Sequence, residues 1–244
     1  MKTRFLCLLL PGLFLTVAAL AQQQEAPARE LYRIHFFKAA PGKLPDLVEA
    51  YRNAPLPDNR TPRPLVFRHR VGGDWDLMVI YPLGAKAGLD ANPGPLPPAL
   101  ARFRERVMAN YAWHTDTYAS GPPLAEVEKA LAVPEAAKGS GGVYLVEHYT
   151  ALPGHQKALE DVLRRDLAIA RAGSTVLLEH VQGASWDFLV AFRYASWQEW
   201  AAAETDPAAD DLARRQGFAD SDDIGLQLRQ HMSAHQDNFL SRVQ

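Results

Sequence analysis

Apolar and polar residues alternate in the same way in two stretches, 68–81 and 179–192, which read RHRVGGDWDLMVIY and EHVQGASWDFLVAF. In each stretch, two runs rich in apolar residues flank a short turn of small and polar residues, and this pattern predicts a β-hairpin. Trp75 and Trp186 hold the same place in the two hairpins. We therefore expect one structural module to occur twice in the chain.

The same order of elements surrounds both hairpins. An aromatic-rich strand is predicted over 31–38 and again from position 143, and each strand is followed by a Pro-Gly break and an amphipathic helix at a constant offset of 112 residues. A longer helix closes each half, at about 98–113 and about 222–234. Agreement in order and register between two halves is stronger evidence for a repeated module than any single motif.

Other segments are marked by local signals. The stretches 114–118 and 235–239, which follow the closing helices, fit either a helix end or a short fourth strand. Glycine and proline residues predict an irregular loop over 84–98. Ser196 and Glu199 have the spacing of a capping box and predict a helix start in the second half.

A strand, a helix, a hairpin, a helix and a final strand make up a ferredoxin-like βαββαβ unit. With its aromatic strand, Pro-Gly break and helix over 31–53 and again over 143–162, the chain resembles the dimeric α/β-barrel superfamily. That superfamily includes the NIPSNAP, EthD, stress-responsive barrel, antibiotic-biosynthesis monooxygenase and chlorite dismutase families. The resemblance implies an α+β fold in which two units place their sheets face to face, with helices outside, as an intramolecular barrel. No member family's catalytic signature is intact in the sequence.

The predicted organisation has five parts. They are a signal peptide at 1–21, a flexible leader at 22–30, a first ferredoxin-like unit at 31–120, a linker at 121–142 and a second unit at 143–244. Two basic residues, a short apolar run and an Ala-Leu-Ala step have the layout of a cleaved secretory signal. We therefore expect a secreted or periplasmic protein.

Composition narrows the classes of function. Cys7 is the only cysteine and lies inside the predicted signal, so the mature chain would have no disulfide, thiolate metal site or cysteine nucleophile. Without the signal, 24 basic residues face 28 acidic ones, because the segment removes two of the 26 Lys and Arg residues. This acidic balance argues against nucleic acid or an anionic membrane as the partner.

The hairpin register brings histidine and aspartate together. With a turn at 71–74, His69 lies opposite Asp76, and the second hairpin places His180 opposite Asp187. The same register predicts the apolar partners Leu65 with Ile80, Phe67 with Met78, Val176 with Ala191 and Leu178 with Leu189. A carboxylate beside an imidazole suits a general base, although such a pair also serves as a structural ion pair that fixes the register.

The first strand of each half offers two sets of side chains. One set comprises Arg33, His35, Phe37, Leu145, Glu147 and Tyr149, and the other comprises Tyr32, Ile34, Phe36, Tyr144, Val146 and His148. We expect the first set inside the barrel, because the second, largely apolar set suits the underside of the helices. Arg68 then faces Glu179 and His35 faces Glu147 across the barrel, either at a ligand site or as bridges that lock the halves together.

These positions define a candidate small-molecule site in the barrel. The proposed ligand-binding residues are Arg33, Phe37, Arg68, Arg70, Trp75, Tyr149, Glu179, Trp186 and Phe188, and the proposed catalytic residues are His69, Asp76, His180, Asp187, His35 and Glu147. Tryptophans would hold a flat apolar or aromatic compound and an arginine its anionic group. A histidine would remove a proton in a cofactor-independent, monooxygenase-like or isomerase-like reaction.

Two alternatives remain open at this point. In the first, the barrel is filled by its own side chains and the protein is a non-catalytic interaction module. In the second, the protein binds haem non-covalently through His148, His180 or His231. No cofactor and no metal are predicted. His114 with Asp116 and His235 with Asp237 recur at matching places, but no third ligand stands at a standard spacing.

Overall fold

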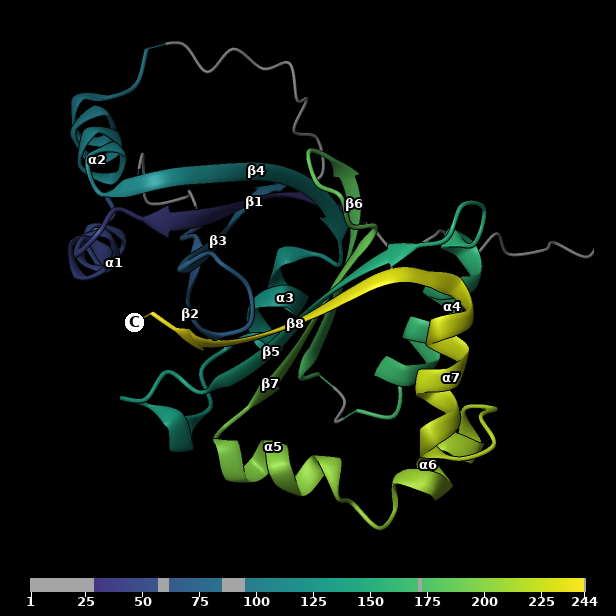
Figure 1. Ribbon diagram of the computed structural model, residues 1–244. Coiled ribbons are helices and arrows are strands. Elements are labelled where there is room, and N and C mark those ends of the chain that lie inside the picture. Colours follow the sequence, from purple (N-terminus) through teal and green to yellow (C-terminus); the bar gives the residue numbers. More distant parts are fainter. Residues whose placement is uncertain (1–28, 57–61, 85–94, 171–172, 244) are drawn as a thin grey trace, which may run out of the picture.

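The computed structural model describes residues 29–56, 62–84, 95–170 and 173–243, and within them the chain forms a mixed α+β protein (Figure 1). The first half contains β1 (Glu30–Ala39), α1 (Leu44–Arg52), β2 (Leu65–Val71), β3 (Leu77–Gly84), α2 (Pro98–Met108) and β4 (Tyr111–Gly121). The connection contains α3 (Leu124–Ala130) and the short 3-10 turn η1 (Glu135–Ala137). The second half contains β5 (Val143–Ala151), α4 (Gln156–Leu167), β6 (Thr175–Gln182), β7 (Phe188–Tyr194), α5 (Trp197–Glu204), α6 (Ala209–Arg215), α7 (Ser221–His231) and β8 (Met232–Arg242).

The strands of the described residues form one closed barrel in the order β1-β3-β2-β8-β5-β7-β6-β4. Within each half the order is that of a ferredoxin-like sheet, β4-β1-β3-β2 and β8-β5-β7-β6. The halves join at two antiparallel seams, β2 with β8 and β4 with β6. A single chain thus closes the barrel, as the resemblance implied, and closure leaves no free sheet edge.

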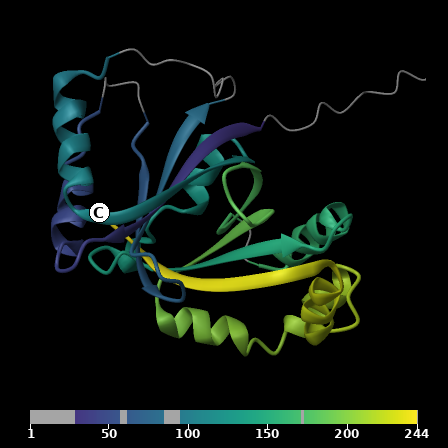
Figure 2. The ribbon, with the colours of Figure 1, turned by 45° about the horizontal axis from the view of Figure 1, so that its top comes forward.

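The helices of each half cover the outside of its own sheet. In the first half, α1 and α2 pack on outward side chains of β1, β2 and β3, and Leu47, Tyr51 and Val107 lie in that cluster. In the second half, α4, α6 and α7 pack on β5, β6 and β7 around Leu159, Leu163 and others. Figures 1 and 2 show the two helical groups on different sides of the molecule.

The inward face is the opposite of the one predicted from the first strands. Tyr32, Ile34 and Phe36 and their counterparts Tyr144 and Val146 are buried in the core inside the barrel. The alternate residues Phe37 and Tyr149 pack with the helices outside the barrel, and Arg33, His35, Leu145 and Glu147 alternate with the core residues on that outward face. Both faces of each sheet are partly covered in this fold, so apolar residues occur in both sets and the alternation alone did not identify the inner one.

The segment between the halves closes one end of the barrel. Val127, Ala130 and Leu131 of α3 and its C-terminal end belong to the same core as the inward strand residues. The hydroxyl of Tyr32 donates to the carbonyl of Pro122 (2.5 Å), and that of Tyr144 donates to the carbonyl of Leu131 (3.1 Å). Residues 121–142 therefore contribute a plug as well as a connection.

Several local predictions are confirmed. The hairpin partners Leu65 with Ile80, Phe67 with Met78, Val176 with Ala191 and Leu178 with Leu189 are all observed. Ser196 caps α5 by accepting a hydrogen bond from the backbone amide of Glu199 (3.2 Å). The stretches 114–118 and 235–239, which the sequence left undecided between a helix end and a strand, lie in the fourth strands β4 and β8. The predicted closing helices are too long, because β4 and β8 begin at Tyr111 and Met232.

Some predictions fall outside the described residues. The signal at 1–21 and most of the leader lie there, as does most of the loop predicted over 84–98. Among the helices that the structure describes, none has the length and apolar character needed to cross a bilayer.

Candidate functional site

A cavity of about 470 Å³ lies at the end of the barrel opposite α3, between the two hairpin turns. Its walls come from both halves and are mainly aromatic and polar. They comprise Phe36, Asp74, Trp75, Trp113, Thr115, Thr117, His148, Gly183, Ala184, Ser185, Trp186 and Gln236. We call this space the mouth cavity.

The two hairpin tryptophans flank the mouth cavity. Trp75 meets Phe36 edge to face with the ring centres 5.0 Å apart, and Trp186 stacks on His148 at 5.5 Å and 6°. Both indoles are buried, so their rings are held in place by the barrel core. Two fixed indoles with apolar neighbours are suited to a flat apolar or aromatic ligand. Trp75 and Trp186, which were named from the sequence as ligand-binding residues, thus both line the mouth cavity.

Phe36 and His148 occupy equivalent positions in the two halves. Phe37 pairs with His114 in the first half and Tyr149 pairs with His235 in the second, which aligns β1 with β5 at an offset of 112 residues. The mouth cavity thus lies between matching elements of the two halves, and the side chains at this pair of matching positions differ in chemistry. A phenyl ring in one half is replaced by an imidazole in the other.

His148 has a ring nitrogen without a protein partner. The residue is 9% exposed, and its buried Nε2 has no hydrogen-bond partner. Burial lowers the pKa of His148 to about 4, against a smaller opposing effect of a side-chain hydrogen bond with Gln236. The imidazole is therefore neutral at physiological pH and has one nitrogen that no protein group satisfies.

His69 and His180 have different environments although they are equivalent residues. His180 Nε2 accepts a hydrogen bond from the backbone amide of Ala184 (3.0 Å). His69 stacks on Trp75 at 4.3 Å, its Nε2 is buried without a partner, and burial lowers its pKa. Both rings thus contact a tryptophan of the cavity wall, since His180 lies edge to face with Trp186 (5.4 Å between ring centres), and His180 also holds its own turn.

The predicted His/Asp pairs do not form between side chains. The backbone register is as predicted, since His69 and His180 donate their amide hydrogens to the carbonyls of Asp76 and Asp187. The carboxylates turn away, however. That of Asp76 accepts from the amide of Ala39 (2.8 Å), and that of Asp187 accepts from the amide of Ala151 (2.7 Å). Both aspartates therefore cap the end of the neighbouring first strand, a role that the pairing argument did not consider.

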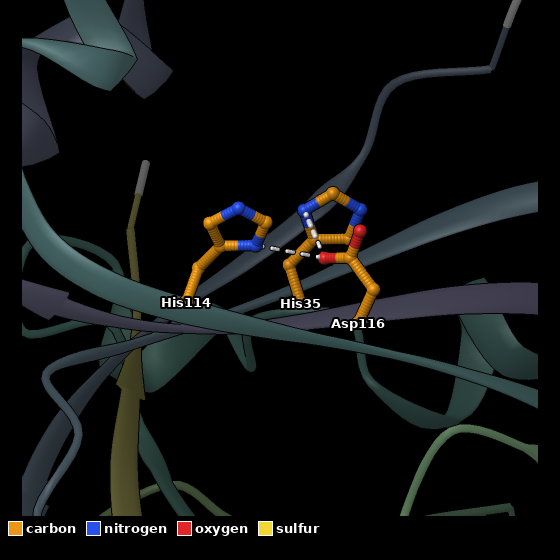
Figure 3. A group of neighbouring side chains, drawn as sticks. All are labelled: His35, His114 and Asp116. Atoms are coloured by element: carbon orange, nitrogen blue, oxygen red, sulfur yellow. Dashed lines mark hydrogen bonds and ion pairs between the residues drawn. The ribbon is translucent and has the colours of Figure 1, made fainter.

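His35 belongs to a polar cluster outside the barrel, shown in Figure 3. His35 Nδ1 lies 3.2 Å and His114 Nδ1 lies 3.1 Å from the same carboxylate oxygen of Asp116. Burial lowers the pKa of His35 to about 4, and the Asp116 charge opposes this effect. The predicted contact of His35 with Glu147 across the barrel is wrong, because both residues face outward, on opposite halves of the barrel.

Glu147 occupies the equivalent position in the second half. Its carboxylate accepts a hydrogen bond from the Tyr149 hydroxyl (2.8 Å) and lies 3.9 Å from Nε2 of His235. Burial raises the pKa of Glu147 to about 7. The residue forms a local network with its own half and does not reach the mouth cavity.

The remaining predicted ligand residues lie away from the mouth cavity. Glu179 pairs with Arg29 (3.1 Å), so the predicted Arg68 to Glu179 bridge is not formed. Arg70 donates to Ser241 across the β2 to β8 seam (2.9 Å), and the guanidinium of Arg33 lies over the Tyr81 ring at 5.2 Å. Phe37, Tyr149 and Phe188 are buried under the helices.

Among the three histidines considered as haem ligands, His148 has the most suitable nitrogen. His180 Nε2 is engaged by Ala184, and His231 Nδ1 lies 3.0 Å from Nδ1 of His155. The unpartnered Nε2 of His148 is the atom that fits an axial ligand or a proton acceptor.

Sequence reasoning missed part of the mouth cavity. Trp113, Thr115 and Gln236 come from the fourth strands, whose pairing was left open at that stage. A usable signal was present, because the offset of 112 residues aligns Phe36 with His148 and marks the one exchange of phenyl for imidazole along these strands.

Comparisons with known proteins support the fold. No family model matches the chain, and no curated protein matches it. Among solved structures, a candidate monooxygenase from Lactobacillus acidophilus has a TM-score of 0.57 at 8% identity and covers 89% of this chain and 95% of that one. A candidate monooxygenase from Fusobacterium nucleatum has a TM-score of 0.55 at 8% identity, with 89% and 94% covered. An anthrone oxidase-like protein has a TM-score of 0.52 at 16% identity, with 89% and 92% covered. At these identities the similarity establishes the dimeric α/β-barrel fold alone.

Proposed function

We propose that this single-chain dimeric α/β-barrel protein binds a small, flat apolar or aromatic molecule in the mouth cavity and removes a proton from it through His148. The observation that carries the proposal is the unpartnered, buried Nε2 of His148 in the wall of a cavity of about 470 Å³. A buried polar atom without a partner costs free energy, and a ligand that supplies a hydrogen recovers it.

The chemistry follows from the state of the imidazole. Burial holds the pKa of His148 near 4, so its ring is neutral and Nε2 can accept a hydrogen bond. Transfer of a proton to this nitrogen would be favoured by the negative charge that then develops on the bound ligand beside it. Trp75 and Trp186 would stack on the ligand and exclude water from it. The proton passes to Nε2 and the electron pair stays on the ligand, where an aromatic or carbonyl system delocalises it. Return of the proton to another atom gives an isomerisation, and reaction of the anion with molecular oxygen gives an oxidation.

The names of the fold relatives suggest which probe to use. Two are described as candidate monooxygenases and one as anthrone oxidase-like. Anthrone is a flat tricyclic ketone with an acidic methylene group, and its anion is aromatic. It therefore combines the shape that the tryptophans favour with the proton that His148 would accept.

The test is deuterium exchange of the anthrone methylene group in D₂O without oxygen, followed by NMR. The wild-type protein should speed exchange above the buffer rate. His148→Phe, which copies the Phe36 of the other half, should lose this acceleration while still binding anthrone in calorimetry. Trp186→Ala should lose binding.

His155→Gln serves as the matched control, because His155 lies at the start of α4, where its Nδ1 is 3.0 Å from Nδ1 of His231, and does not line the mouth cavity. Its exchange rate should equal that of the wild type. Exchange that persists in His148→Phe would show that His148 is not the base, and absence of anthrone binding by the wild type would contradict the assignment of a flat aromatic ligand. An absorbance spectrum of the same sample tests for bound haem. A Soret band would mean that haem chemistry, and not proton removal by His148, is the function of the site.

A non-catalytic interaction module is the second candidate function. It is favoured by the middle of the barrel, which is filled by the side chains of its own core. The two functions differ at the mouth cavity. A protein that binds no small aromatic compound, and whose Trp186→Ala variant behaves like the wild type, belongs to this second class.

We also propose that the mature protein works outside the cytoplasm. The support is the basic, apolar and Ala-Leu-Ala sequence of residues 1–21. Terminal sequencing of the protein from a periplasmic fraction should find a start near Gln22. An intact terminus in the cytoplasmic fraction would contradict the proposal.

A further inference from the structure

Three potential metal ligands meet on the outer face of the first half, away from the mouth cavity. His35 comes from β1, and His114 and Asp116 come from β4, where residues two apart share a face. Their ligand atoms all lie within 4.8 Å of one another. Figure 3 shows the two imidazole rings side by side, with dashed lines from one nitrogen of each ring to the same carboxylate oxygen of Asp116.

The distances within this cluster match those around a metal ion. The carboxylate oxygen of Asp116 lies 3.2 Å from Nδ1 of His35 and 3.1 Å from Nδ1 of His114. Neighbouring ligands of an ion with bonds of about 2.1 Å are about 3.0 Å apart at octahedral angles and about 3.4 Å apart at tetrahedral angles. Both separations fall in this interval, and the two histidine ligand atoms lie within 4.8 Å of each other, so all three ligands can reach one ion after the side chains adjust.

The ligands are also held in place before any ion binds. The centre of the His35 ring lies 5.5 Å from that of Phe37 and 5.1 Å from that of Tyr81. The centre of the His114 ring lies 5.6 Å from that of Phe37 and 4.9 Å from that of Tyr111. The two imidazole planes are 15° apart. Fixed ligands lose little conformational entropy on binding an ion, which favours affinity.

We propose that His35, His114 and Asp116 form a binding site for a divalent first-row transition metal such as Zn²⁺, Co²⁺ or Fe²⁺. Two imidazoles and one carboxylate on one side of an ion leave its other positions open. The open side faces solvent, since the side chains of His114 and Asp116 are 37% and 39% exposed and that of His35 is 13% exposed. Water or a small ligand can therefore complete the coordination.

The charges around the site indicate the class of the completing ligand. Arg33 lies on the same face of β1 as His35, and its buried Nε has no partner. A divalent ion and one guanidinium outweigh the single carboxylate of Asp116, so the open positions favour a small anion. Azide added to the Co²⁺-loaded protein should change its visible spectrum, and Arg33→Gln should weaken this azide response.

The second half provides a matched control. The equivalent residues are Glu147, His235 and Asp237, which offer one imidazole and two carboxylates. Imidazole ligands favour transition metals, whereas a site with two carboxylates suits harder cations. His114 and His235 are thus equivalent positions with different expected roles.

The experiment is a titration of the chelator-treated, untagged protein with Zn²⁺ by calorimetry and with Co²⁺ by visible absorbance. It is performed in a His155→Ala background, because His155 and His231 form a second imidazole pair. The parent protein should bind one ion with d–d bands, and His114→Ala or Asp116→Asn should weaken binding about tenfold or more. His235→Ala should stay within about threefold of the parent.

Circular dichroism and the melting temperature show whether each variant is folded, and His114→Gln provides a milder change at the same position. A parent protein that binds neither ion overturns the proposal. It is also overturned if folded His114→Gln and Asp116→Asn bind Zn²⁺ within about threefold of the parent. Loss of binding in both these variants supports it.

Discussion

His148 stacks on Trp186 at the place where, in the other half of the barrel, Phe36 meets Trp75 edge to face. The halves share their topology, yet this one exchange puts a neutral imidazole with a free nitrogen into an otherwise aromatic wall. The mouth cavity is therefore asymmetric, and its matching positions Thr115 and Gln236 on the fourth strands differ as well. The predictions below test this position and the elements that support it.

The stability of the protein should fall as the pH decreases from about 6.5 toward 4. Above this window His148 is neutral in the folded and unfolded states, so it makes no pH-dependent contribution. Within this window, His148 binds a proton in the unfolded chain but stays unprotonated in the folded protein. Burial and the nearby charge of His235 lower its pKa in the folded protein to about 4. The full shift corresponds to roughly 3 kcal/mol.

The measurement for this prediction is urea unfolding of the wild type and His148→Phe at pH 7 and pH 4.5. The variant should lose less stability over this interval, since it lacks the group that titrates. Other buried histidines remain in both proteins and cancel in the comparison. Equal losses in the two proteins would mean that His148 is already solvated.

Asp187→Ala should reduce the free energy of unfolding by about 1–3 kcal/mol, because the amide of Ala151 loses its acceptor. Ligand binding at the mouth cavity should change little, since the carboxylate points toward β5 and α4. Asp76→Ala should behave similarly at Ala39. Chemical denaturation checks the stability, and a variant that stays fully stable but loses ligand binding would restore the functional reading of the His/Asp pairs.

Gly183→Ala should be more destabilising than Gly154→Ala. Both glycines have a positive φ, 97° and 80°, so each substitution incurs a backbone cost of about 1–2 kcal/mol. An added Cβ at Gly183 would also lie 2.5 Å from the backbone oxygen of Asp116, whereas nothing lies within 4 Å at Gly154. Melting temperatures of the two variants should therefore differ, and similar values would indicate that the hairpin tip moves freely against β4.

Tyr144→Phe should loosen the plug at the closed end of the barrel. The buried hydroxyl of Tyr144 donates to the carbonyl of Leu131 at the end of α3, and its removal leaves that carbonyl without this donor, at a cost of about 1 kcal/mol. Amide hydrogen exchange should become faster in α3 and stay unchanged in α1. Uniform acceleration across both helices would show a global rather than a local effect.

The sequence predicted much of the fold because the relevant signals are local. Hairpin register follows from turn length and alternation, and so Leu65 opposite Ile80 could be read directly. The capping box of Ser196 and Glu199 depends on residues three apart. The constant offset between the halves placed the strands and helices in order.

The candidate sites depended on longer-range pairing. Asp116 reaches His35 because β4 lies beside β1, and the sequence left open whether 114–118 was a strand at all. The mouth cavity combines residues of both halves, so its walls were known only once the barrel closed.

The sequence by itself determined two ferredoxin-like halves, their hairpins and the positions of their tryptophans. Only the tertiary structure decided which face of each sheet is the interior, that the aspartates of the predicted pairs cap strands, and that His148 rather than His35 lines the cavity. The physical reason is that each sheet is buried on both faces, by the opposite half and by its helices. Apolar residues then occur in both alternating sets along each strand, and local pattern does not show which set faces the interior.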